Sequence, residues 1–131
     1  MPSLLKIVFT AATTDAHIPT VADEGSYFLQ CPESPETYVA YTTTSIDLHT
    51  SITIPNGWYG RITSRVADPS GAAECFAVAQ IIHGTGSAVP IILSMVNVSG
   101  TNRTPTANIH QAIITFHKKK DVVGTFTGTW A

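Results

Sequence analysis

The stretch IPNGWYGRITSR, residues 54–65, places a turn between two β-strands. Residues 46–54 alternate apolar and polar side chains, which is the period of a strand with one buried face. Pro55 fixes its own φ and Gly57 tolerates a positive φ, so the chain is expected to turn here. Residues 58–63 continue as a second strand. The segment therefore predicts two strands joined by a tight turn.

The rest of the chain repeats this pattern of strands and turns. Short β-branched and aromatic runs are separated by turn residues, and few segments have the spacing of an amphipathic helix. Ile91, Ile92 and Leu93 are apolar on both faces, which indicates a strand buried between two layers. The remaining strands are expected at residues 6–10, 27–29, 76–83, 91–96 and 109–117. These features predict one all-β domain over residues 1–131, built as a sandwich, jelly roll or barrel.

Charge and composition exclude several classes of function. The net charge is −2 and only 12% of the 131 residues are charged, so we expect no nucleic acid and no anionic membrane as a partner. The basic run at residues 118–120 is typical of a solvated strand end. Secretory signals and membrane-spanning apolar runs are absent, which predicts an intracellular protein without membrane insertion. Cys31, Cys75 and the five histidines match no metal-site spacing, so we expect free thiols and no metal site.

Residues 54–65 resemble the dUTPase family. In that family a strand ends in Pro-x-Gly and is followed by Tyr-Gly-Arg-Ile and by an Arg that opens the second conserved motif. Weaker similarities extend over most of the chain. They give one vestigial nucleotide-binding position from each of the first, second, fourth and fifth motifs: Asp15, Arg65, Gln111 and Phe126.

The resemblance implies a distorted jelly roll or β-barrel that assembles as a homotrimer, with sites built between subunits. It also implies hydrolysis of dUTP to dUMP and pyrophosphate. In that reaction Mg²⁺ bridges the phosphates, and a carboxylate of the third motif activates the attacking water.

The sequence departs from the family pattern where the chemistry lies. In a register without gaps, Gly84 stands at the essential aspartate of the third motif, and Ser87 stands at the tyrosine that packs on the deoxyribose. A glycine cannot accept a proton from water. His83 adjoins the lost aspartate, but its side chain is expected to face away from that site. We therefore assign no catalytic residue and interpret the region around His83, Gly84 and Ser87 as a degenerate site.

Cys-Pro-Glu-Ser at residues 31–34 adds a similarity to the dUTPase-derived proteins of adenovirus early region four. That resemblance implies a viral, non-enzymatic protein that binds host proteins, in some cases through a PDZ-binding tail. Thr129 lies two residues before Ala131, as a PDZ ligand requires, although Ala is a poor terminal residue for such a ligand. Trp58 is a further partner-binding candidate, expected on the outer face, whereas Tyr59 is expected in the core or at a trimer interface.

Three functions remain open. The leading hypothesis is a catalytically inactive dUTPase-like scaffold that acts through protein–protein interaction and needs no cofactor. The second is an active, Mg²⁺-dependent dUTP diphosphatase in which a shifted register or another base replaces the lost carboxylate. The third is a β-sandwich that binds carbohydrate or another ligand. Its threonine-rich strands favour this third hypothesis, but no acidic calcium cluster supports it.

Overall fold

The computed structural model describes residues 5–23, 25–32, 37–64, 75–104, 110–120, 124–125 and 127–128. These residues form nine β-strands: β1 (Val8–Ala11), β2 (Thr20–Asp23), β3 (Ser26–Gln30), β4 (Thr43–Thr53), β5 (Trp58–Ser64), β6 (Cys75–Ala77), β7 (Gln80–His83), β8 (Ala88–Asn97) and β9 (His110–Lys118). In this part of the chain there is no helix that could cross a membrane.

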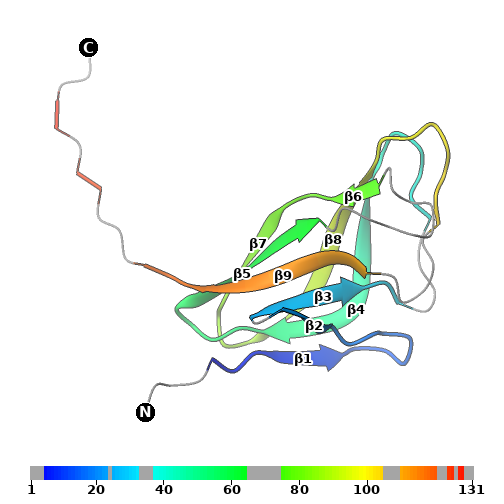
Figure 1. The fold of residues 1–131 in the computed structure, drawn as a ribbon. Helices are drawn as coiled ribbons and strands as arrows, with labels where there is room; N and C mark the ends of the chain where they lie inside the picture. The colour runs from blue at the N-terminus through cyan, green and yellow to red at the C-terminus, as the bar shows by residue number, and fades with distance from the viewer. Residues whose placement is uncertain are drawn as a thin grey trace.

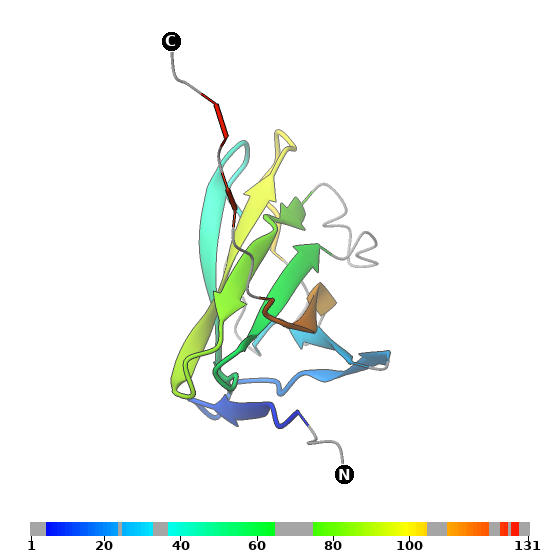
Figure 2. The same cartoon turned by 90° about the vertical axis from the view of Figure 1, so that its left-hand side faces the viewer.

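The strands make two antiparallel sheets that lie against each other as layers (Figures 1 and 2). The four-stranded sheet has the order β1-β4-β8-β6, and the five-stranded sheet has the order β2-β3-β9-β5-β7. Because sequence neighbours are often in different sheets, the chain passes repeatedly from one layer to the other. The predicted all-β class is confirmed.

The hydrophobic core fills the space between the two sheets. Every strand except β2 places at least one side chain in the core or against it. The alternation predicted for residues 46–54 is confirmed. Full burial of a large aliphatic side chain stabilises the fold by about 1.5–3 kcal/mol. The largest aliphatic members of this core are Leu29, Ile46, Leu48, Ile52, Ile54, Ile62, Ile91, Leu93, Met95 and Ile114, all at most 2% exposed.

The turn predicted after residue 54 joins β4 to β5. The Trp58 amide donates a hydrogen bond to the Pro55 carbonyl oxygen at 3.3 Å. Gly57 has a φ of 86°, a conformation that residues with a Cβ rarely adopt. Gly60 faces the core, and a Cβ there would lie 2.7 Å from Cδ1 of Ile114. This glycine of the Tyr-Gly-Arg-Ile segment therefore makes room for a core side chain of the neighbouring strand β9.

The structure differs from the expected strands in three respects. The edge strand β2 was not predicted. The single strand expected at residues 76–83 is split, because the chain leaves the four-stranded sheet after β6 and enters the five-stranded sheet as β7. The Gln80 side chain holds this crossing, since its Nε2 donates to the Ile92 carbonyl oxygen at 3.0 Å. Ile92 is itself 43% exposed, so β8 is not buried on both faces.

Asn97, at the end of β8, ties together two loops at one end of the molecule. Its side chain is buried and donates from Nδ2 to the carbonyl oxygens of Tyr38 and Thr101, both at 2.9 Å. Its Oδ1 accepts hydrogen bonds from the backbone N and the Oγ of Ser99, at 2.9 and 2.7 Å. The Asn-Val-Ser sequon that starts here is therefore closed to glycosylation in the folded chain.

Both cysteines are buried, and they are not joined in a disulfide. Sγ of Cys31 lies 3.7 Å from Oη of Tyr38, so this thiol packs against a buried aromatic residue.

Candidate functional site

The segment that resembles the third motif connects β7 to β8 and rests on the turn between β4 and β5. The Gly84 amide donates to the Trp58 carbonyl oxygen at 2.8 Å, and the Gly86 amide donates to the Ile54 carbonyl oxygen at 2.9 Å. Two backbone hydrogen bonds thus join the two connections. Backbone atoms therefore hold this segment against the turn.

Gly84 is buried at this contact, and the space beside its Cα is already filled. A Cβ at this position would lie 2.0 Å from the Pro55 carbonyl oxygen and 2.6 Å from the Trp58 carbonyl oxygen. Separations this short between nonbonded heavy atoms are strongly repulsive, and the atoms involved belong to the backbone of a tight turn. A carboxylate at residue 84 therefore requires the turn to move.

The neighbours of Gly84 do not replace the missing base. His83 is exposed, and its register partner on β5 is Tyr59. Ser87 is exposed as well, and its amide donates to Oγ1 of Thr85 at 3.3 Å. Both side chains are in contact with solvent and have no described carboxylate partner, so nothing in this loop orients them for proton transfer.

The expected outer face of Trp58 was wrong, and Tyr59 is not in the core; its alternative place at a trimer interface stays a prediction. Trp58 packs partly against the core, and Tyr59 lies on the outer face of the five-stranded sheet. The Tyr59 ring stacks on that of His117, with centroids 5.2 Å apart and an angle of 27° between the planes. Gly60 and Ile62 of β5 face the core, whereas Arg61 is exposed. Because side chains of a strand alternate, Trp58 shares the inner face and Tyr59 shares the outer face.

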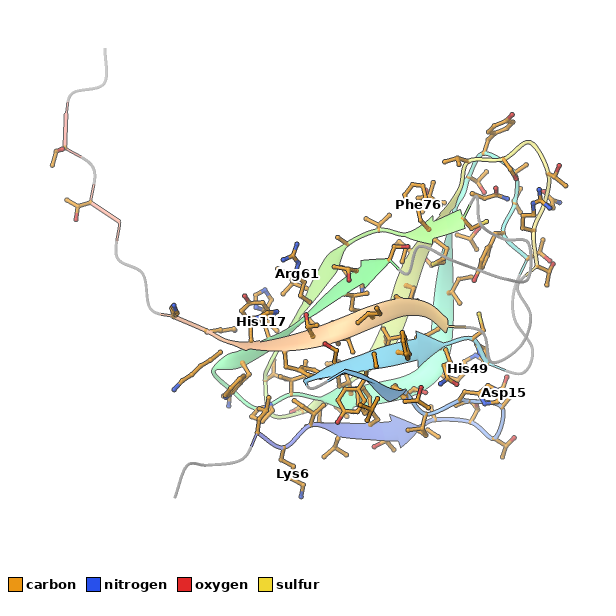
Figure 3. The ribbon with its side chains drawn as sticks, in the orientation of Figure 1. Lys6, Asp15, His49, Arg61, Phe76 and His117 are labelled. Carbon is orange, nitrogen blue, oxygen red and sulfur yellow. The ribbon has the colours of Figure 1, made fainter. Side chains whose placement is uncertain are left out.

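A cluster of three polar side chains, Thr13, Asp15 and His49, joins β4 to the segment after β1. Nδ1 of His49 lies 2.9 Å from Oδ1 of Asp15, and Oγ1 of Thr13 donates to the same carboxylate oxygen. His49 has a φ of 56° and lies in a bulge where the β4–β8 register shifts between Asp47 and Ser51. Figure 3 shows this pair at the end of the sandwich opposite to Arg61 and His117.

The hydrogen bond from Thr13 lowers the pKa of the Asp15 carboxyl below its ordinary value of 3.8, and the hydrogen bond and charge of His49 lower it further. Asp15 is thus engaged by its own chain. Its predicted role in nucleotide binding stays a prediction. The pairing with His49 joins residues 34 positions apart, and no local pattern of the sequence indicated it.

The other predicted site residues cannot be placed in the same way. Arg65, Phe126, Thr129 and Ala131 lie outside the described residues. The backbone of Gln111 belongs to β9, and its side chain is outside the description.

Comparisons with known proteins define the fold. Neither a protein-family model nor a curated protein matches the sequence. Solved structures do match. A mutant dUTPase from phage phi11 of S. aureus has a TM-score of 0.74 at 12% sequence identity, over 95% of this chain and 98% of the phage chain. A mutant dUTPase of Staphylococcus bacteriophage 80alpha has a TM-score of 0.76 at 10% identity, over 96% and 98% of the two chains.

This chain has the dUTPase fold. The expected fold class is therefore confirmed, and the identities of 10–12% establish the fold alone. The phi11 structure concerns the coordination of a structural Mg(II) ion. In this chain, by contrast, the described residues include no group of three or more His, Cys, Asp or Glu side chains that could hold a metal ion.

Proposed function

We propose that this chain is a catalytically inactive dUTPase-like scaffold that acts by binding other proteins. The observation that carries the proposal is the packing of Gly84. General-base catalysis requires a proton acceptor within hydrogen-bond reach of the attacking water. Here the position that resembles the family's aspartate has no side chain, and backbone oxygen atoms occupy the space that one would need.

The proposal extends to the setting of the scaffold. We take it to be a viral homotrimer that works inside a host cell and binds a host protein, as the resemblance to the adenovirus early-region-four proteins implies. The partner-binding candidates are Thr129, Ala131 and the part of the Trp58 side chain that is left exposed beside the core. Solved phage dUTPases offer a parallel, because those of bacteriophage 80alpha are described as controlling the transfer of virulence genes. Proteins with this fold can thus act in roles other than hydrolysis.

The test is release of pyrophosphate from dUTP in the presence of Mg²⁺, with dTTP and UTP as control substrates. The bacteriophage 80alpha dUTPase serves as the positive control under the same conditions. We expect no release above the rate without protein. Release selective for dUTP would overturn the proposal and favour the active Mg²⁺-dependent diphosphatase, with the exposed imidazole of His83 as the first residue to substitute.

A further inference from the structure

An open groove runs over the outer face of the five-stranded sheet, at the end where β5, β7 and β9 lie side by side. Tyr59 of β5 is the register partner of both His83 on β7 and His117 on β9, so three rings form one row across the strands. The groove has a volume of about 780 Å³. A smaller hollow of about 370 Å³ continues it over Tyr59, Arg61 and Ile81.

Positive charge is concentrated along this surface. The chain has only seven lysine and arginine residues. Four of them line the groove or its continuation: Arg61, Lys118, Lys119 and Lys120. The residues that line both hollows include no Asp or Glu. A protein with a net charge of −2 therefore carries a local positive field on one face, which attracts negative groups.

The backbone holds this charge in position. The Lys119 amide donates to the Gly57 carbonyl oxygen at 2.7 Å, and Lys118 pairs with Trp58 in the β5–β9 register. The lysines therefore lie at the end of β9, next to the turn that contains Gly57, and they border the groove. The run predicted to be a solvated strand end is exposed as expected, and it also forms one wall of a hollow.

The floor of the groove combines aromatic and apolar surface with this charge. Ile81 is 53% exposed, and Tyr59 presents its ring stacked on His117. Tyrosine and arginine are enriched at the energetic centres of protein interfaces. An exposed isoleucine beside them suits an apolar side chain of a partner, whereas a nucleic acid would gain little from it. The four cations also fall short of the broad basic surface that tracks a phosphate backbone.

We propose that this groove binds an extended, acidic segment of a partner protein. Carboxylates of the segment face Arg61 and Lys118–Lys120, and an apolar side chain contacts Ile81 and Tyr59. This inference rests on the proposed function and deepens it, since it assigns the interaction to one surface and states the chemistry of the partner.

The test is a binding titration by fluorescence anisotropy on the full chain. The probe is a short fluorescein-labelled peptide of Glu, Asp and Leu, and its control replaces every acid with Lys. We expect the acidic peptide to bind and the basic peptide not to bind. The triple variant Lys118→Gln, Lys119→Gln, Lys120→Gln should raise Kd on the order of tenfold, because it removes several exposed charge contacts at once. Ile81→Ser should also raise it.

Lys6→Gln is the matched control, because Lys6 is an exposed lysine that does not line the groove. It should leave Kd unchanged, and circular dichroism verifies that every variant is folded. Equal weakening by Lys6→Gln, or equal binding of both peptides, would overturn the proposal. So would displacement of the peptide by dUTP, or tighter binding of a single-stranded oligonucleotide at the same salt concentration. dUTP hydrolysis is assayed on the same samples. Absence of both hydrolysis and peptide binding would overturn only the groove proposal, whereas hydrolysis of dUTP would overturn the proposed scaffold function.

Discussion

At the scale of a single residue, the packing around Gly84 links sequence to function most directly. We predict that Gly84→Ala destabilises the fold by about 2–3 kcal/mol, as overpacking of a closed site does, because the added Cβ meets the carbonyl oxygens of Pro55 and Trp58. Chemical denaturation measures this loss. Ser87→Ala, in the same loop but exposed, should change stability by less than about 0.5 kcal/mol.

Gly84→Asp extends the same prediction to activity. The variant restores the family's residue type but should be at least as destabilised as Gly84→Ala, and it should release no pyrophosphate from dUTP. A stable Gly84→Asp variant with new activity would contradict both the packing and the account of the lost site.

Asp15 leads to a prediction about pH. Its folded pKa is lowered from 3.8 by the Thr13 hydrogen bond first and by His49 second. The carboxylate therefore contributes stability above the unfolded value of 3.8, and this contribution disappears as the pH falls through the folded pKa. We expect the carboxyl carbon of Asp15 to titrate below 3.8 by NMR, and to move back toward that value in Thr13→Ala. An unchanged titration in Thr13→Ala would contradict this order of causes.

The sequence predicted which residue stands at a motif position better than it predicted which residues contact one another. The register that resembles the family placed Gly84 at the third motif, but nothing local to that motif indicated that the Pro55–Trp58 turn fills the adjacent space. The pairing of Asp15 with His49 was equally hidden, since a bulge in β4 creates it. The inward face of Trp58 and the outward face of Tyr59 are different in kind. They could have been predicted, because an apolar Ile62 is expected to face the core and residues of one strand alternate.

At the scale of elements, Asn97 connects the end of β8 to two loops. We predict that Asn97→Ala destabilises the chain by about 3 kcal/mol, because it removes four hydrogen bonds of a buried side chain and takes away the acceptor of the Ser99 amide. Hydrogen exchange at the Ser99 amide should accelerate at the same time. Asn102→Ala is the control, since Asn102 is exposed and its Oδ1 accepts one hydrogen bond, from the Ala40 amide at 2.9 Å. A loss in that variant as large as in Asn97→Ala would contradict the assignment.

Most of the expected strands are observed, and the two differences are the missed β2 and the division of residues 76–83 into β6 and β7. Residues 46–54 carry their buried face in the sequence itself. The edge strand β2 is short and largely solvent-exposed, so it lacks that signal. The run 76–83 is mostly apolar and carries no turn residue at the place where the chain changes sheet. Its division between two sheets depends on tertiary pairing with β8 and β5, which a local pattern does not contain.

At the scale of the whole molecule, the proposed homotrimer can be tested without any ligand. Size-exclusion chromatography with light scattering should give a mass three times the 14.0 kDa of one chain, with no dependence on protein concentration in the micromolar range. A mass of one chain under these conditions would refute the trimer. It would leave the groove on the five-stranded sheet as a site that a single chain provides alone.

The contact at Gly84 also has a consequence for evolutionary history. A glycine codon can become an aspartate codon by a single base change, so in genetic terms this chain can lie one step from the family's residue. In structural terms it lies further away, because the turn has to open before the aspartate can be accommodated. The order of the two changes then matters, and the aspartate would be selected against if it came first. If an ancestor of this chain was an enzyme, the close-packed turn would now oppose the mutation that restores the aspartate at residue 84.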